Sequence, residues 1–453
     1  MTPRTAIPRG EPSVDPNTIN AMPTKQLFIS MLTRDIGLIP SIIDLVDNAA
    51  DGARQLRADG GLAGLWVRVE ASERSFKISD NCGGISVETA RNYAFRFGRA
   101  AGAPAVRHSV GQFGVGMKRA IFKLGSRCRV ESATKTSSFV VNLDVAKWAT
   151  SKEWEFEFSD VVEATTIAAD KRGTRIHITS LHADVASKLA LQSFENELAR
   201  ELERRLQEPI SRGLAVSMNG LPVAARPLLM LADKRLVPAA KVLKFKAPKQ
   251  KVVRVKLFCG LGPSDRALAG WHVFCNGRLV LEADKTIVTG WGEKARGLEI
   301  AGFHNQYTHL RGFAYFDSDD PGLLPWNTTK TGLDTDSAVY RATRLEMIRL
   351  MQPVVRFLNQ VKVERQDLGP DSSGHLQEML AASKTVAVDD VQHRPVFTVR
   401  YTPITIRRPS VQRLQYDVPL DKAEQVKKVL KVSSWKALGE RTFDYFYDNE
   451  VAE

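Results

Sequence analysis

Three aspartates and one asparagine lie close together in residues 44–52, which read DLVDNAADG. The surrounding run, LIPSIIDLVDNAADGARQL, predicts a helix on which Asp44, Asp47, Asn48 and Asp51 share one narrow face. No lysine or arginine stands among them, so this face should repel itself, unlike an ordinary solvated face. Mg²⁺ prefers oxygen ligands of this kind and usually binds together with phosphates. This acidic stripe, formed by Asp44, Asp47, Asn48 and Asp51, therefore predicts a Mg²⁺ site, with a solvated helix face as the alternative.

A glycine-rich segment, residues 111–125 (GQFGVGMKRAIFKLG), predicts a phosphate-binding loop that opens a helix. Gly111, Gly114 and Gly116 allow close approach of the backbone, and the first N–H groups of a helix attract anions. Lys118 and Arg119 add positive charge. The spacing matches neither a Walker A loop, which ends in G-K-[ST], nor the dinucleotide fingerprint G-x-G-x-x-G. Taken alone, the segment could also be a plain turn.

Two further segments combine a short predicted strand with glycine residues at one of its ends. Residues 76–86 (FKISDNCGGIS) predict a strand that runs into a tight turn, where Asp80 could accept a hydrogen bond from an exocyclic amine. Residues 172–181 (RGTRIHITSL) predict a strand that starts at Gly173-Thr174. In isolation, an Asx turn that only closes a loop would be the favoured interpretation of the first segment, and a single Gly-Thr before a strand has little meaning.

In this order, the four segments resemble the motifs of the Bergerat-fold (GHKL) ATPases, the superfamily of gyrase B subunits, ninety-kilodalton heat-shock chaperones, histidine kinases and MutL. The family's E-x-x-D-N corresponds to residues 44–48, D-x-G-x-G to 80–84, G-x-x-G-x-G to 111–116 and the GT to 173–174. The chain looks most similar to the MORC branch and its bacterial relatives. The resemblance implies an α+β fold, with an ATPase α/β sandwich followed by a transducer-like α/β domain and a small C-terminal module.

The resemblance also implies roles for individual residues. Asn48 would bind Mg²⁺, and Asp80 would bind the adenine amino group. Asp44 would activate the attacking water where the family often has a glutamate, and its shorter side chain should affect the rate more than binding. The other residues expected to bind the nucleotide are Asp47, Asp51, Gly84, Ile85, Gly111, Gln112, Phe113, Gly114, Val115, Gly116, Met117, Lys118 and Thr174. Residues 86–110 would form a lid over the nucleotide.

A transducer-like domain is expected to supply a lysine that reaches the γ-phosphate. Lys330, in LPWNTTKTGLD, is the predicted catalytic lysine, and Lys285 is its competitor. Residues 271–288 (WHVFCNGRLVLEADKTIV) predict a β-hairpin that turns at Asn276-Gly277. A helix over residues 339–366 would close the domain.

At 453 residues the chain is long enough for two or three domains. The expected division is a flexible arm (1–22), an ATPase domain (23–200), a transducer-like domain (201–366), a linker (367–393) and a small C-terminal module (394–453). The sequence contains no apolar run long enough to span a membrane. Four scattered cysteines without a C-x-x-C pair favour a reducing cytoplasm over structural zinc.

The formal net charge is +13, and two segments carry basic residues without acids. Residues 241–256 and 394–413 could contact phosphate backbones, although neither contains a base-reading motif. The alternative is a basic protein that meets no nucleic acid.

We therefore expect a cytoplasmic, Mg²⁺-dependent ATPase in which ATP closes the lid and joins two copies into a homodimeric clamp. A role in DNA handling, whether MORC-like, in repair or in anti-phage defence, follows from the resemblance alone. The alternative is a non-hydrolysing ATP-binding scaffold, or a chaperone-like clamp for a protein partner.

Overall fold

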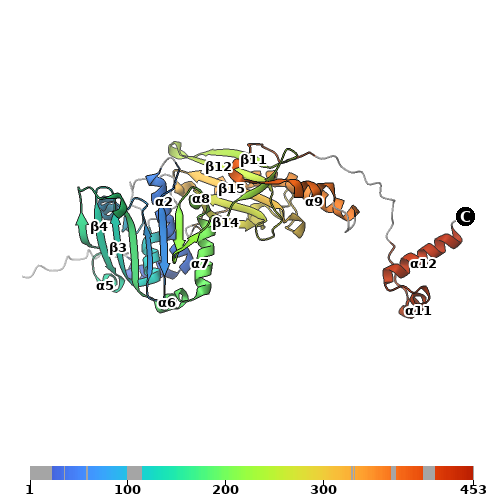
Figure 1. The fold of residues 1–453 in the computed structure, drawn as a ribbon, viewed down its shortest axis with the longest axis horizontal. Helices are drawn as coiled ribbons and strands as arrows, with labels where there is room; N and C mark the ends of the chain where they lie inside the picture. Colours follow the sequence, from blue (N-terminus) through green and yellow to red (C-terminus); the bar gives the residue numbers. More distant parts are fainter. Residues whose placement is uncertain are drawn as a thin grey trace, which may run out of the picture. The chain divides into compact units, whose positions relative to one another are not determined.

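The computed structural model describes residues 23–34, 36–57, 60–98, 115–327, 330, 332–368, 374–400 and 414–451. It divides the chain into two compact units, Met1–Thr402 and Pro403–Glu453. The fold is a mixture of helices and strands, and the larger unit contains two main sheets (Figure 1).

The first sheet has eight strands in the order β5-β4-β3-β6-β2-β1-β7-β8. Its neighbouring strands are antiparallel except for the parallel pair β1 and β7. The strands are β1 (Trp66–Ala71), β2 (Phe76–Asp80), β3 (Gly125–Ala133), β4 (Ser138–Asp144), β5 (Phe158–Val162), β6 (Gly173–Leu181), β7 (Ala215–Met218) and β8 (Leu221–Val223).

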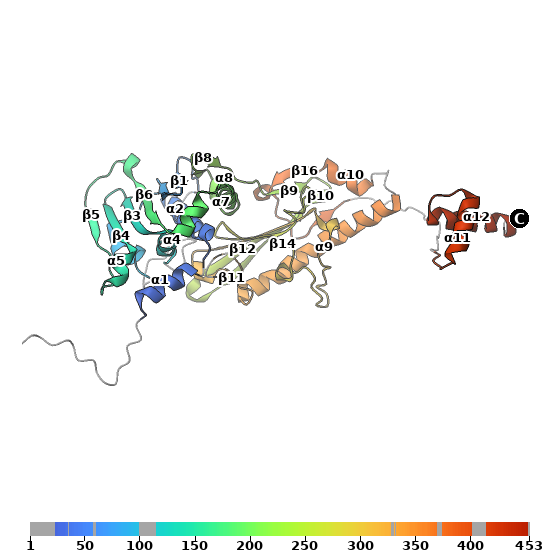
Figure 2. The same cartoon turned by 90° about the horizontal axis from the view of Figure 1, so that it is seen from below.

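Helices cover one face of this sheet (Figure 2). In β3, for example, Cys128 and Val130 are buried while Arg127 and Arg129 are exposed, which is the alternation of a strand with one solvated face. The helices of this part are α1 (Lys25–Arg34), α2 (Leu38–Leu56), α3 (Val87–Thr89), α4 (Gly116–Leu124), α5 (Val145–Thr150), α6 (Ala183–Leu189), α7 (Gln192–Arg205) and α8 (Gln207–Ser211), with a π-helical turn at Ala90–Ala94 and a 3-10 turn at Ala169–Lys171.

The helix predicted around the acidic stripe is confirmed as α2. Pro40 lies in its first turn, where a missing N–H breaks no intrahelical hydrogen bond. Ile42, Ile43 and Val46 are fully buried, and α2 packs against both α4 and the sheet. The helix is thus buried on most sides, as its apolar residues predicted.

The second sheet has five strands in the order β11-β12-β15-β13-β14. Helix α9 packs on one face, while β9 and β16 lie over apolar residues of the other (Figure 2). These elements are β9 (Leu229–Ala232), β10 (Leu236–Val237), β11 (Ala239–Lys246), β12 (Val252–Leu261), β13 (Gly270–Cys275), β14 (Arg278–Asp284), β15 (Leu310–Ser318), α9 (Ala338–Leu368), β16 (Lys384–Ala387) and β17 (Thr398–Val399), with 3-10 turns at Pro248–Gln250, Ile287–Thr289, Asn305–Tyr307, Pro321–Leu323 and Val388–Asp390.

The predicted hairpin is confirmed: β13 and β14 pair through Cys275 and Arg278. Asn276 and Gly277 both have positive φ, at 46° and 76°, as a two-residue type I′ turn requires. The predicted closing helix corresponds to α9.

The expected linker, 367–393, differs from the structure in its described part. Residues 375–387 form α10 (His375–Ala382) and β16, which pairs with β9. The reason is that Met379, Leu380 and Val388 are buried against the second sheet, so this segment has an apolar face of its own.

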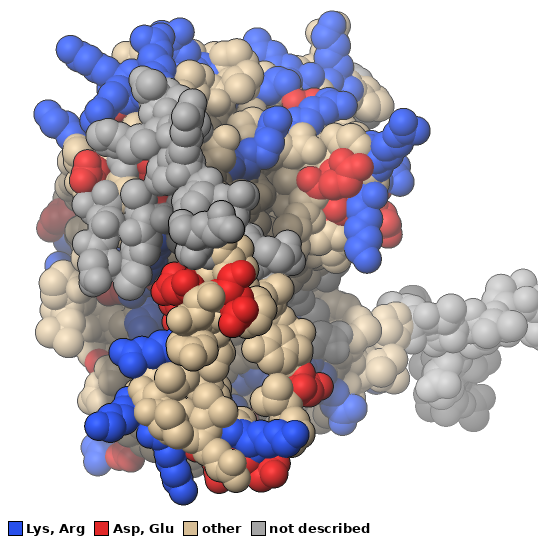
Figure 3. All heavy atoms as spheres, turned by 90° about the vertical axis from the view of Figure 1, so that its right-hand side faces the viewer, with Lys and Arg blue, Asp and Glu red and all other residues tan. Residues whose placement is uncertain are grey.

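The C-terminal unit contains α11 (Leu420–Leu430) and α12 (Trp435–Glu450). The predicted helix near residue 420 is therefore present, and the aromatic-rich segment after it is also helical. No helix among the described residues is long and apolar enough to cross a membrane. Lysines and arginines, interspersed with smaller acidic groups, are spread over the face in Figure 3.

Candidate nucleotide site

The first motif and the end of the third lie next to each other. A Cβ placed on Gly116, the first residue of α4, would lie 3.4 Å from Asp44 Oδ2 on α2. Val115 precedes the helix as its N-cap residue, and Met117 is buried in the core. Asn48 is exposed on α2. Gly111, Gln112, Phe113 and Gly114, together with lid residues 99–110, lie outside the described residues.

Asp80 connects the second motif to the fourth. Its Oδ1 accepts hydrogen bonds from the backbone N–H groups of Cys82 (2.8 Å) and Thr174 (3.3 Å). Burial raises the pKa of Asp80 to about 6, and these two N–H groups oppose the shift. A carboxylate held in this way at the end of β2 can accept a further hydrogen bond from a ligand.

Two glycines let the backbone close around this carboxylate. Gly84 has a φ of +71°, and a Cβ there would lie 2.1 Å from the carbonyl oxygen of Ala133. Gly173 has a φ of +128°, and a Cβ there would lie 1.9 Å from the carbonyl oxygen of Asp80. Both positions therefore require glycine on grounds of conformation and of space.

Ser132 is a residue of the candidate site that the sequence analysis did not identify. Its Oγ accepts a hydrogen bond from the Ile85 N–H (2.7 Å) and lies 2.9 Å from Thr174 Oγ1. It thus joins the loop of the second motif to the start of β6. Serine within a strand is common, so only the pairing of β3 with β6 identifies it.

The expectation of an uncompensated acidic stripe is wrong. Asp44 Oδ2 accepts a hydrogen bond from Arg119 Nη2 (2.6 Å), while Asp44 Oδ1 lies 3.4 Å from Arg278 Nη1 and 3.8 Å from Lys330 Nζ. Asp47 forms an ion pair with the same Nη1 of Arg278. The cations come from distant segments, which is why no local inspection of α2 could find them.

The third aspartate of the stripe is paired as well. Asp51 lies 3.0 Å from Arg54 Nη1, and Arg54 Nη2 lies 2.8 Å from Glu208 on α8. Glu208 in turn pairs with Arg212 at 2.6 Å. The charges of these four residues balance, which gives Asp51 a structural role, while its expected nucleotide contact stays a prediction.

Lys330, the predicted catalytic lysine, lies next to the first motif. It is 6 % exposed, has a φ of +55°, and its ammonium faces Asp44. Burial lowers the pKa of Lys330 to about 8, and Asp44 opposes that shift. The competitor, Lys285, instead donates to the carbonyl oxygen of Ala283 and lies over the ring of Phe303.

Lys118 is placed differently from a lysine that is open to phosphate. It is 2 % exposed, and its Nζ donates to the carbonyl oxygen of Ala94 (2.8 Å) at the end of the π-helical turn. Burial lowers the pKa of Lys118 to about 7. In this arrangement Lys118 connects α4 to the first part of the expected lid.

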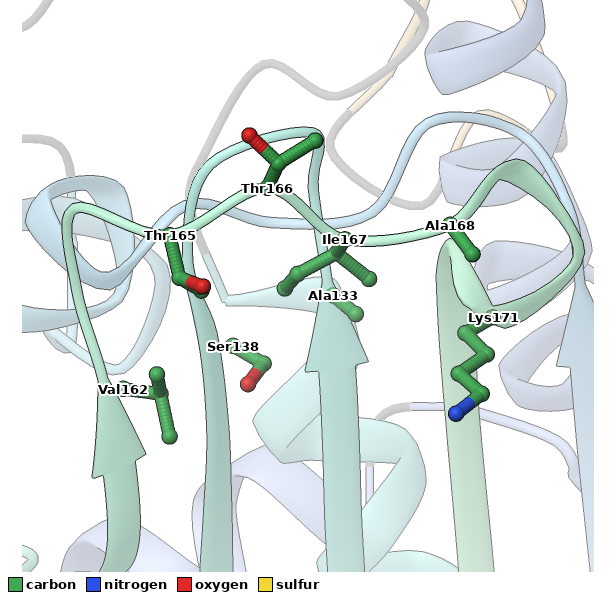
Figure 4. A pocket seen from close by; sticks show the side chains of 8 residues that line it. All are labelled: Ala133, Ser138, Val162, Thr165, Thr166, Ile167, Ala168 and Lys171. Carbon is green, nitrogen blue, oxygen red and sulfur yellow. The ribbon is translucent and has the colours of Figure 1, made fainter.

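A separate hollow of 420 Å³ lies where the loop from β5 to β6 crosses the ends of β3 and β4 (Figure 4). The side chain of Ile167 points into it, and Lys171 lies at one side. None of the residues predicted to bind the nucleotide lines this hollow, so it is distinct from the candidate site.

The described parts of the four motifs lie close together beside α2 and the first sheet. A family model described as histidine kinase-, DNA gyrase B-, and HSP90-like ATPase matches residues 38–174. This range begins with α2 and ends at Thr174, so it contains all four motifs. The match supports the GHKL-type ATPase superfamily for this part of the chain, and domains of that superfamily bind ATP. No curated protein matches the chain.

Proposed function

We propose that this site binds ATP together with Mg²⁺ and hydrolyses it to ADP and phosphate. The observation that carries the proposal is the contact between Gly116, at the start of α4, and Asp44 on α2, with Asn48 exposed one turn further along that helix. The other end of α2 approaches the adenine-binding residues, because a Cβ on Gly52 would lie 2.7 Å from the carbonyl oxygen of Cys82. A nucleotide lying along α2 would reach both the phosphate-binding residues near Asp44 and the adenine-binding residues near Gly52.

The donor set fits a magnesium ion that arrives with the phosphates. Among the described residues, no group of three or more His, Cys, Asp or Glu side chains could hold a metal. Asn48 is the one oxygen ligand of the stripe that is exposed, and Mg²⁺ commonly takes only one or two protein ligands beside phosphate and water. When bound, the ion would neutralise phosphate charge.

The protein's own residues would orient the substrate. Asp80 would accept a hydrogen bond from the adenine amino group, and Thr174 would hold that carboxylate through its N–H. The N–H groups at the start of α4 would face the phosphates, and Lys330 would offset negative charge on the transferred group. Asp44 is 2 % exposed, so it can accept a proton from water only after its oxygens are released from Arg119, Arg278 and Lys330.

The burial and ion pairs of Asp44 favour one alternative, a scaffold that binds ATP without hydrolysing it. Titration calorimetry with ATP, with and without Mg²⁺, tests binding, and single-turnover hydrolysis tests chemistry. The ATPase proposal expects Mg²⁺-dependent binding followed by release of phosphate. Binding with no phosphate release would support the scaffold, and a failure to bind ATP would end both proposals.

A second part of the proposal is an ATP-dependent homodimer that acts on nucleic acid, as in MORC-like proteins. The nucleic-acid part is supported by four exposed basic residues on paired strands of the second sheet, where Lys244 is opposite Arg254 and where Lys246 and Lys256 point to the same face. Such a face would bind phosphate backbones without reading sequence. Of the second basic segment, 394–413, the structure describes only residues 394–400.

Size-exclusion chromatography with and without a non-hydrolysable ATP analogue tests the dimer. Duplex-DNA binding as a function of salt tests the basic face. The variant Lys244→Gln/Arg254→Gln should reduce the salt slope by about 2, whereas Lys152→Gln/Lys171→Gln, with the same change in charge at exposed positions of the first domain, should leave the slope unchanged. Equal slopes for the two double variants would remove the basic face from the proposal.

A further inference from the structure

Arg278 is the first residue of β14, directly after the Asn276-Gly277 turn, and it is 1 % exposed. Its Nη1 faces the carboxylates of Asp44 and Asp47 on α2. A residue of the second sheet therefore extends into the candidate site. The resemblance to the GHKL ATPases implied no role for Arg278.

The other edge of the same guanidinium has no hydrogen-bond acceptor in the part of the chain that the structure describes. Nε and Nη2 of Arg278 are buried and lack a hydrogen-bond partner among the described residues. In arginine these two N–H groups lie side by side, and together they can hold two oxygens of a carboxylate or phosphate. A buried donor without an acceptor costs about 1–3 kcal/mol, so this edge is arranged for an acceptor that the described chain does not supply.

The charges around Arg278 point to an anion. Within the described cluster, the cations Arg119, Arg278 and Lys330 face two carboxylates, Asp44 and Asp47, which leaves one positive charge in excess. Arg119 Nε is likewise buried, with no hydrogen-bond partner among the residues described. An excess of buried positive charge with free N–H groups is stabilised by an oxoanion.

We propose that Arg278 binds the terminal phosphate of the nucleotide through its Nε–Nη2 edge. This proposal rests on the proposed function, which supplies the nucleotide, and it adds a second phosphate-binding residue from the second sheet beside Lys330. The β13–β14 hairpin then senses whether the terminal phosphate is present. ATP and ADP would be distinguished by Arg278, whereas Asp80 would bind the base of both.

Arg278→Lys tests this proposal because it keeps the charge next to Asp44 and Asp47 while removing the paired N–H edge. Calorimetry would measure the affinities of wild type and variant for Mg²⁺ with a non-hydrolysable ATP analogue, and for Mg²⁺ with ADP. We expect the variant to lose roughly 10-fold to 100-fold in affinity for the analogue and less than about 2-fold for ADP. Arg341→Lys, an exposed arginine on α9, is the matched control and should change neither affinity.

A purely structural role of Arg278 would weaken both nucleotides equally, and that result would overturn the proposal. An unchanged preference for the analogue would overturn it too, while leaving the proposed function intact. A wild type that binds neither nucleotide would remove the proposed function and this inference together. Should Arg278→Lys fail to fold, Asp47→Asn/Arg278→Gln removes one charge of each sign, and the same selective loss is expected from it.

Discussion

Arg278 Nη1 lies 3.4 Å from Asp44 Oδ1, although 234 positions separate the two residues in the sequence. The contact joins the second sheet to α2 of the ATPase domain, and both side chains are almost completely buried. Removing one partner of such a pair leaves an uncompensated buried charge and costs about 3–5 kcal/mol. Asp44 therefore has a structural role in addition to the water-activating role that the resemblance implies.

Asp44→Asn separates these two roles. The amide keeps an acceptor for Arg119 but cannot take a proton from water, so single-turnover ATP hydrolysis should fall by at least about 100-fold. Binding of ATP should change little, and the free energy of unfolding should fall because three cations then face only one carboxylate. Asp184→Asn, an exposed aspartate on α6, should match the wild type in all three measurements. Equal hydrolysis by wild type and Asp44→Asn would exclude Asp44 as the base.

Asn48→Ala should lose Mg²⁺-dependent nucleotide binding without loss of stability. Asn48 is exposed on α2, and alanine is the better helix former, so the free energy of unfolding should stay the same or rise slightly. Titration of the nucleotide with Mg²⁺ and with EDTA would measure the loss. If Asn48→Ala bound Mg–ATP as wild type does, the metal would have to be held elsewhere.

The sequence was sufficient for the elements whose signals are local. The apolar residues around Asp44 predicted α2, and Asn276-Gly277 predicted the β13–β14 turn. In both cases the pattern that forms the element lies within the element itself. The same holds for the strands that carry Asp80 and Thr174.

The partners of the acidic stripe could not be predicted in this way. Arg119 is 75 positions from Asp44, and Arg278 is 234 positions away. Nothing in the residues around Arg278 distinguishes a buried arginine from an exposed one at the start of a strand. Contacts between elements depend on the tertiary fold, so the sequence showed the acids but not the cations that neutralise them.

Gly84→Ala should disrupt the adenine end of the site. Its φ of +71° is strained for alanine, and the new Cβ would lie 2.1 Å from the carbonyl oxygen of Ala133. We expect a loss of about 2 kcal/mol or more in the free energy of unfolding, together with weaker ATP binding. Gly61→Ala is the matched control, because a Cβ there meets nothing within 4 Å. Similar unfolding curves for the two variants would show that the backbone at Gly84 is free to move.

The buried carboxyl of Asp80 should make stability depend on pH. Its pKa is raised from 3.8 to about 6 in the folded protein, so the folded state binds this proton more tightly than the unfolded chain does. The contribution of Asp80 to stability is therefore greatest below about pH 4 and declines as the pH rises to about 6, by up to about 3 kcal/mol. Urea denaturation of wild type and Asp80→Asn across this range would measure it. If the difference between the two proteins were constant from pH 4 to pH 6, the raised pKa would be excluded.

Lys330 should set the alkaline limit of ATP hydrolysis. Burial lowers its pKa to about 8, so the ammonium that offsets phosphate charge is present below that pH and is lost above it. The value of kcat/KM, which reports the free enzyme, should therefore fall as the pH rises through about 8. In Lys330→Arg this fall should disappear, because arginine stays protonated throughout the range.

Lys285→Arg is the control for that experiment, since Lys285 is the competing lysine and its ammonium lies over the ring of Phe303. It should retain the fall near pH 8. If kcat/KM still fell near pH 8 in Lys330→Arg but not in Lys285→Arg, the lysine that offsets phosphate charge would be Lys285. Persistence in both variants would mean that the group titrating near pH 8 is neither lysine, and the contact of Lys330 with Asp44 would then be purely structural.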